Sequence, residues 1–209
     1  RLRVRNLLVK EVARRPFPPF ITSTLQQAGS RVFNYTPSRT MRIAQALYEG
    51  VDFGEGPVGL ITYMRTDSVT VARDAQEAAR RFLADRFGAV FVPEKPNVYR
   101  SRSRAQEAHE AIRPTDVTRT PDSLHGHLES DELKLYTLIW QRFLASQMTP
   151  ARIEQRTVEV EAPAADSVSE AQGSDAEPDY LFRATASQVV FPGYMAAFGD
   201  KKAKPVRET

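Results

Sequence analysis

The sequence contains no cysteine among its 209 residues. This absence excludes disulfide scaffolds, cysteine nucleophiles, zinc fingers and iron–sulfur clusters within the chain. No apolar run approaches the roughly 20 residues that a membrane-spanning helix needs, and the arginine-rich start lacks the apolar stretch of a signal peptide. The sequence therefore predicts a cytoplasmic protein. It begins with Arg1 instead of methionine and closes on a polar tail, which is typical of a piece of a longer polypeptide.

Several common catalytic patterns are also missing. The three histidines are dispersed, and no Ser-His-Asp, paired-carboxylate or metal-ligand spacing stands out. Gly54, Gly56 and Gly59 precede an extended run instead of a helix, so their spacing does not indicate a phosphate-binding loop. We therefore predict that the chain itself holds neither a metal site nor a nucleotide site.

Charge is segregated along the chain, although the net charge is only +3. Residues 1–42 hold nine basic residues against one acid, whereas residues 161–180 hold six acids and no base. A segregated charge creates a local field that the whole-chain value hides. The basic segment is equally compatible with a solvated face and with nucleic-acid binding.

The spacing of apolar residues predicts an α+β fold. Period-two patterns indicate strands at the start of the chain, at 156–160 and at 180–186, the last two joined by an acidic loop over 162–178. Helical spacing and capping residues predict the following helices: 21–28, 37–49, 68–87, 105–113 and 131–148. A mainly helical domain at 19–151 is thus inserted into a β-rich one at 1–18 and 152–209, and the first two helices form a helix-turn-helix-like unit.

The run from Gly59 to Ser68 carries the clearest chemical signal. In an extended segment residues i and i+2 lie about 7 Å apart on one face, so Tyr63 and Arg65 point the same way, opposite to Thr62 and Met64. At pH 7 only about one phenol in a thousand is ionised, and a neighbouring guanidinium both favours the phenolate and stabilises phosphoryl oxygens. The pair suits attack on a phosphodiester. The alternative is an ordinary strand tyrosine that packs.

A second cluster combines Arg100, Arg102 and Arg104 with the stretch Gln106–Thr115. In an extended segment the three arginines fall on one side and track a phosphate backbone, or they form a solvated loop. His109 and Arg113 are four residues apart and share one face of the helix expected over 105–113. Together they could contact a phosphate, and the alternative is a pair of ordinary surface residues.

Four motifs resemble those of bacterial type IA DNA topoisomerases, in the family's order and spacing. They are Pro19–Gln27, Ala44–Glu49, Leu60–Ser68 and Gln106–Thr115. Met64 stands where topoisomerase III relatives usually carry proline, which favours the topoisomerase I branch. The resemblance implies a helical domain that carries the nucleophile, inserted into part of an antiparallel β-rich arch.

The resemblance also assigns roles to individual residues. It implies that Tyr63 forms a phosphotyrosine with the 5′ end of a broken DNA strand, that Arg65 holds the scissile phosphate and that His109 hydrogen-bonds near it. It also implies that Gln45 and Glu49 line the site and that Thr62 and Asp67 support it. With the residues of the second cluster, the predicted DNA-binding residues are Gln45, Glu49, Thr62, Asp67, Arg113, Arg100, Arg102 and Arg104.

For the whole enzyme the family implies relaxation of negatively supercoiled DNA without ATP, through a single-stranded segment at the cleavage site. Mg²⁺ belongs to an N-terminal domain that these residues do not include, so we expect this segment alone to be inactive. Two alternatives come from other classes. A non-catalytic nucleic-acid-binding or hinge module would leave Tyr63 merely packed, and a tyrosine recombinase would place its tyrosine nearer the C-terminus.

Overall fold

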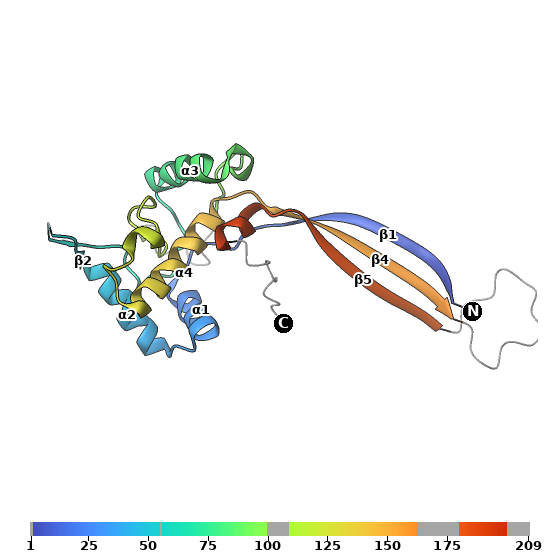
Figure 1. Ribbon diagram of the computed structural model, residues 1–209, viewed down its shortest axis with the longest axis horizontal. Helices are drawn as coiled ribbons and strands as arrows, with labels where there is room; N and C mark the ends of the chain where they lie inside the picture. The colour runs from blue at the N-terminus through green and yellow to red at the C-terminus, as the bar shows by residue number, and fades with distance from the viewer. Residues whose placement is uncertain (1, 55, 100–108, 163–179, 200–209) are drawn as a thin grey trace, which may run out of the picture. The chain divides into compact units, whose positions relative to one another are not determined.

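The computed structural model describes residues 2–54, 56–99, 109–162 and 180–199 (Figure 1). The chain forms two compact units, and each is built from two segments that alternate along the sequence. The first comprises Arg1–Arg14 and Pro150–Pro192, and the second comprises Arg15–Thr149 and Gly193–Thr209. The predicted combination of helices and antiparallel strands is confirmed. Within the described ranges no helix has the length and apolar character needed to cross a membrane.

The first unit is a three-stranded antiparallel sheet. Its strands are β1 (Arg3–Arg14), β4 (Ala151–Ala162) and β5 (Tyr180–Phe191), with β4 in the centre, as Figure 1 shows. Leu8 lies opposite Thr157, which lies opposite Thr185. The strands expected from the period-two patterns are confirmed, and the second and third are longer than predicted. The acidic loop expected over 162–178 falls almost entirely outside the described residues.

The second unit packs around helix α4 (Ser130–Ser146). Leu135, Tyr136, Ile139 and Phe143 are buried along one wide face of α4, as the apolar stripe predicts. Helix α2 (Pro37–Glu49) and the short 3₁₀ turns η3 (Pro121–Leu124) and η5 (Gly193–Phe198) pack against this helix. The described residues after Gly193 thus belong with the helices, which corrects the placement of 193–199 in the β-rich part.

Helix α1 (Thr22–Phe33) is longer than the sequence indicates. Gly29 does not end it. A Cβ at Gly29 would lie 2.7 Å from the Thr40 hydroxyl, so this glycine allows α1 and α2 to approach closely. The helix ends instead at Asn34, which adopts the left-handed conformation and donates its N–H to the last turn.

Helix α2 has the ends that its sequence predicts. The Thr36 hydroxyl accepts a hydrogen bond from the Arg39 amide, Pro37 occupies the first turn, and Gly50 follows the last turn with a positive φ. A side chain at Gly50 would also collide with the backbone of Val58. This glycine therefore starts the short hairpin of β2 (Val51–Asp52) and β3 (Pro57–Val58), which brings the chain back toward α2.

A polar cluster joins the start of α2 to the start of α4. The Tyr35 hydroxyl donates to an Asp131 carboxylate oxygen at 2.7 Å, and the Arg39 guanidinium pairs with the other oxygen. Burial and the bond to Asp131 raise the pKa of Tyr35 to about 12, while the bonds from Tyr35 and Arg39 lower the pKa of Asp131 to about 2. The carboxylate remains ionised at neutral pH.

Two predicted helices need correction. Helix α3 (Arg73–Phe87) begins five residues later than the sequence indicates, because the hydroxyls of Thr66 and Ser68 accept amide hydrogen bonds in the preceding residues and hold them in turns. The described part of the helix expected over 105–113 is extended. Ile112 forms a bridge with Phe20 there, and Pro114 forms one with Ile61. η1 (Ala89–Phe91) follows α3.

Candidate active site

The extended run before α3 alternates strictly between exposed and buried side chains. Tyr63, Arg65 and Asp67 are exposed. Met64, Thr66 and Ser68 are buried. Tyr63 is 46% exposed, so its ring is not part of the apolar core. The period-two alternation expected of an extended segment thus places the Tyr63 phenol and the Arg65 guanidinium on the solvent side.

Helix α2 fixes the start of this run. The Leu60 amide donates to the Leu47 carbonyl in the last turn of α2 at 2.8 Å. A Cβ at Gly59 would lie 2.7 Å from the Tyr48 carbonyl oxygen, so only glycine permits this approach. The contact brings the aromatic rings together: the Tyr48 and Tyr63 centroids are 5.4 Å apart, edge to face. Tyr48 lies within the Ala44–Glu49 motif, and no role was predicted for it.

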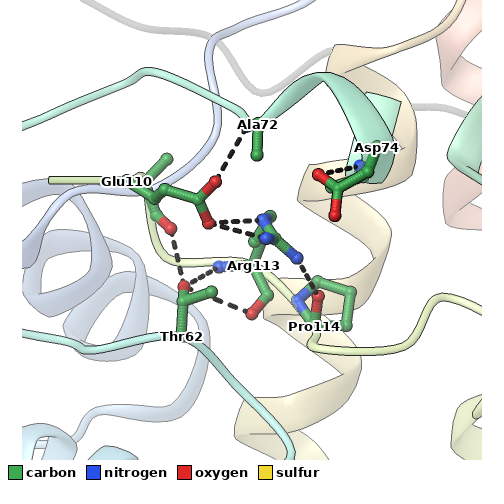
Figure 2. Close-up of polar contacts among 8 residues, drawn as sticks. Thr62, Ala72, Asp74, Glu110, Arg113 and Pro114 are labelled. Atoms are coloured by element: carbon green, nitrogen blue, oxygen red, sulfur yellow. Dashed lines mark hydrogen bonds and ion pairs between the residues drawn. The ribbon is translucent and has the colours of Figure 1, made fainter. Parts of the chain in front are cut away.

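Thr62 joins the run to the extended segment 109–114 (Figure 2). Its hydroxyl donates to the Ala111 carbonyl at 2.6 Å and accepts from the Arg113 amide at 3.0 Å, while its own amide donates to the Arg113 carbonyl at 2.9 Å. The side chain is thereby occupied by backbone partners. His109 is exposed and lies two residues before Ala111, so it belongs to the segment fixed beside Tyr63.

Figure 2 also shows an internal ion pair between Glu110 and Arg113. The Arg113 Nε and Nη2 groups donate to Glu110 Oε2 at 3.0 and 2.6 Å, and Nη1 donates to the Pro114 carbonyl. The Arg113 side chain is only 11% exposed. The other oxygen, Glu110 Oε1, accepts the Ala72 amide just before α3. The predicted DNA contact of Arg113 stays a prediction, and its guanidinium has internal partners.

The other predicted residues that the structure describes lie at two places, on helix α2 and beside Arg65. On α2, the Gln45 amide donates to the Glu49 carboxylate at 2.6 Å, one turn apart. Beside Arg65, a hollow of about 420 Å³ is lined by Asp67 and by residues at the start of α1, which the sequence analysis did not single out: Thr22, Ser23 and Gln26. The remaining three candidates, Arg100, Arg102 and Arg104, lie outside the described residues.

The described residues do not fit a metal ion. No three histidine, aspartate or glutamate side chains within residues 2–54, 56–99, 109–162 and 180–199 gather in a way that could hold one.

The sequence profile of the DNA topoisomerase family matches residues 1–208. The chain belongs to this family. Its curated relatives include DNA topoisomerase 1 of Xylella fastidiosa, 46% identical over 204 residues, and DNA topoisomerase 1 of Campylobacter jejuni, 46% identical over 198. These alignments cover 97% and 94% of this chain but 23% and 26% of the relatives. The chain thus spans about a quarter of the length of these topoisomerases.

A solved structure of full-length topoisomerase I from Thermotoga maritima is similar to this chain, with a TM-score of 0.79 and 38% sequence identity. The match covers 96% of this chain and 30% of that one. The resemblance of the four motifs to bacterial type IA topoisomerases is thereby confirmed, as is the mixed helix and antiparallel-sheet architecture.

Proposed function

We propose that this chain is the part of a bacterial type IA DNA topoisomerase that carries the nucleophile. The whole enzyme relaxes negatively supercoiled DNA by breaking one strand, passing DNA through the break and resealing it without ATP. The observation that carries this proposal is that Tyr63 and Arg65 are both exposed in a run whose alternate side chains are buried and which hydrogen bonds hold on both sides, in a member of the topoisomerase family.

The chemistry is a transesterification. The Tyr63 oxygen attacks the phosphorus of a DNA phosphodiester and loses its proton, the bond from phosphorus to the 3′ oxygen breaks, and that oxygen gains a proton. The product is a 5′-phosphotyrosine and a free 3′-hydroxyl. Because the tyrosyl ester preserves the energy of the phosphodiester, resealing is the reverse step and needs no nucleotide. Arg65 stabilises the negative charge on the phosphoryl oxygens.

The neighbouring residues orient the DNA strand around this phosphate. We assign Gln45 and Glu49 on α2 to the walls of the site, Asp67 to its support and His109 to a hydrogen bond near the phosphate. Thr62 acts through the backbone, since its hydroxyl is occupied by Ala111 and Arg113. The Mg²⁺ of the enzyme and the groups that hold it are assigned to a part of the polypeptide outside these residues, and the enzyme to the cytoplasm, on the nucleoid.

The two units of the chain correspond to two domains in the proposed enzyme. We assign residues 19–151, with which Gly193–Phe198 packs, to a domain, helix-turn-helix-like or winged-helix-like in character, that bears Tyr63 and is inserted into a β-rich arch built on residues 1–18 and 152–192. The contact between α1 and α2 supports the first assignment, and the sheet of β1, β4 and β5 supports the second.

Peptide mapping of a trapped adduct tests the proposal. We expect the full-length polypeptide, denatured during reaction with single-stranded DNA, to carry a 5′-phosphate on a peptide that contains Tyr63. The 209-residue chain alone should bind the same DNA weakly, with a slope of log K against log salt near −3 if about four phosphates are neutralised, and should form no adduct. An adduct on another residue contradicts the proposed nucleophile, and binding with no adduct from the full polypeptide supports a non-catalytic module.

A salt titration separates the roles of two arginines. Removing one phosphate contact from a single strand should reduce the slope of log K against log salt by about 0.7. We expect this reduction for Arg65→Gln, and no reduction for the double variant Glu110→Gln/Arg113→Gln, which removes both charges of the internal pair and so leaves the net charge unchanged. A reduced slope in the double variant would show that Arg113 contacts a phosphate. The melting temperatures of both variants should equal that of the parent, which shows that the substitutions do not affect folding.

A further inference from the structure

Thr22, the first residue of α1, is bonded to the backbone on both sides of Arg65. Its hydroxyl lies 2.7 Å from the Met64 carbonyl oxygen, and the Thr66 amide donates to that hydroxyl at 2.9 Å. The Thr22 amide in turn donates to the Thr66 carbonyl at 2.9 Å. A hydroxyl has one proton and two lone pairs, so it can donate to Met64 and accept from Thr66 at the same time.

The residue between these two backbone partners is Arg65. The side chains of Met64 and Thr66 are buried, and the Thr66 hydroxyl accepts the Ser68 amide at 3.0 Å, which fixes the backbone further along. Arg65 itself projects to the solvent, where its side chain lines the hollow of about 420 Å³ together with Thr22. The backbone on both sides of Arg65 is thus held by the hydroxyl and the amide of Thr22, a residue 43 positions earlier in the chain.

We infer that Thr22 is a positioning residue for Arg65 in strand cleavage. The inference rests on the proposed function. Valine has almost the shape of threonine but leaves the Thr66 amide and the Met64 carbonyl without this partner. The backbone can then relax, and a displacement of about 1 Å at a transition-state group can cost up to 10²-fold in rate.

The first test measures single-turnover cleavage of a single-stranded oligonucleotide by the full-length polypeptide. We expect Thr22→Val to cleave roughly tenfold more slowly with little change in DNA affinity, and Thr22→Ser, which retains the hydroxyl, to stay within about threefold of the parent. The matched control is Thr137→Val, which removes a half-buried hydroxyl that donates to Leu133 in α4 and should leave cleavage unchanged. Unchanged cleavage in Thr22→Val overturns the inference.

A double-mutant cycle shows whether Thr22 acts through Arg65. In an Arg65→Ala background we expect Thr22→Val to slow cleavage by less than about twofold, because the group that it positions is already gone. The same loss in both backgrounds would indicate a general structural role and overturn the inference. A fully active Arg65→Ala variant would instead contradict the proposed function, so the two failures are distinguishable.

Hydrogen exchange of backbone amides in the 209-residue chain tests the hydrogen bond from the Thr66 amide to the Thr22 hydroxyl. The Thr66 amide should exchange roughly tenfold faster in Thr22→Val than in the parent, while the Leu60 amide, bonded to Leu47, should keep its protection. If Thr22→Val does not fold, Thr22→Ala offers the same loss of the hydroxyl with a smaller side chain. Unchanged exchange at Thr66 in a folded variant overturns the inference.

Discussion

Replacement of Tyr63 by phenylalanine is expected to abolish strand cleavage by the full-length polypeptide, by a factor on the order of 10⁴ or more. The substitution removes one oxygen, the atom that forms the bond to phosphorus, and leaves the ring that meets Tyr48 edge to face. The side chain is half-exposed and the backbone bonds of Thr62 are unaffected, so the melting temperature should stay the same. The measurements are covalent adduct on a denaturing gel and relaxation of a supercoiled plasmid.

Tyr48→Phe is the matched control for this substitution. It removes the hydroxyl of the other ring of the pair, which is exposed to a similar degree, and should leave adduct formation within about tenfold of the parent. Cleavage by Tyr63→Phe at the parent rate would exclude Tyr63 as the nucleophile.

Replacement of Arg65 by lysine is expected to slow cleavage by roughly 10²-fold while DNA affinity changes little. Lysine keeps the positive charge but loses the planar fork that can bind two phosphoryl oxygens, and the loss of one transition-state donor typically has this effect. Single-turnover cleavage at saturating DNA isolates the chemical step from binding.

Arg42→Lys, at an exposed arginine on α2, is the control for a conservative change of a surface charge. We expect it to cleave at the parent rate. If Arg65→Lys cleaves as fast as Arg42→Lys, the guanidinium of Arg65 is an ordinary surface charge and makes no directed contact with the phosphate.

Local sequence signals predicted the parts of this fold that depend on neighbours in the chain. The ends of α2 follow from Thr36, Pro37 and Gly50, whose effects act within a few residues. The exposure of Tyr63 and Arg65 follows from the period of an extended segment. The family of the chain was likewise identifiable, because its motifs are contiguous.

The features that the sequence did not predict depend on contacts between residues far apart in the chain. The stretch around Glu110 and Ala111 has good helix formers, yet its described residues are extended, since their backbone groups bond to Thr62, Thr70 and Phe20, at least 40 residues away. The bonds of Thr22 to Met64 and Thr66 span 42 and 44 residues. No periodicity within a short window reports such contacts.

Gly29 illustrates the same limit at a single residue. A glycine after a short helical run is a common helix end, and the helix predicted over 21–28 accordingly stops just before it. Its actual role depends on Thr40 in the next helix, whose hydroxyl occupies the space of a side chain. The contact between Tyr48 and Tyr63 is similar, because it depends on the close approach of Gly59 to α2.

The run that holds Tyr63 is hydrogen-bonded to two other segments of the helical unit. Thr62 ties it to Ala111 and Arg113 immediately before the tyrosine, and Thr22 ties it to α1 on both sides of Arg65. A local swing of the tyrosine backbone would break bonds to two other segments at once. Under the proposed function, a phosphotyrosine at Tyr63 would therefore move together with the whole helical unit when the ends of a cut strand separate, and the attached DNA end would return with Tyr63 and Arg65 in their original relation.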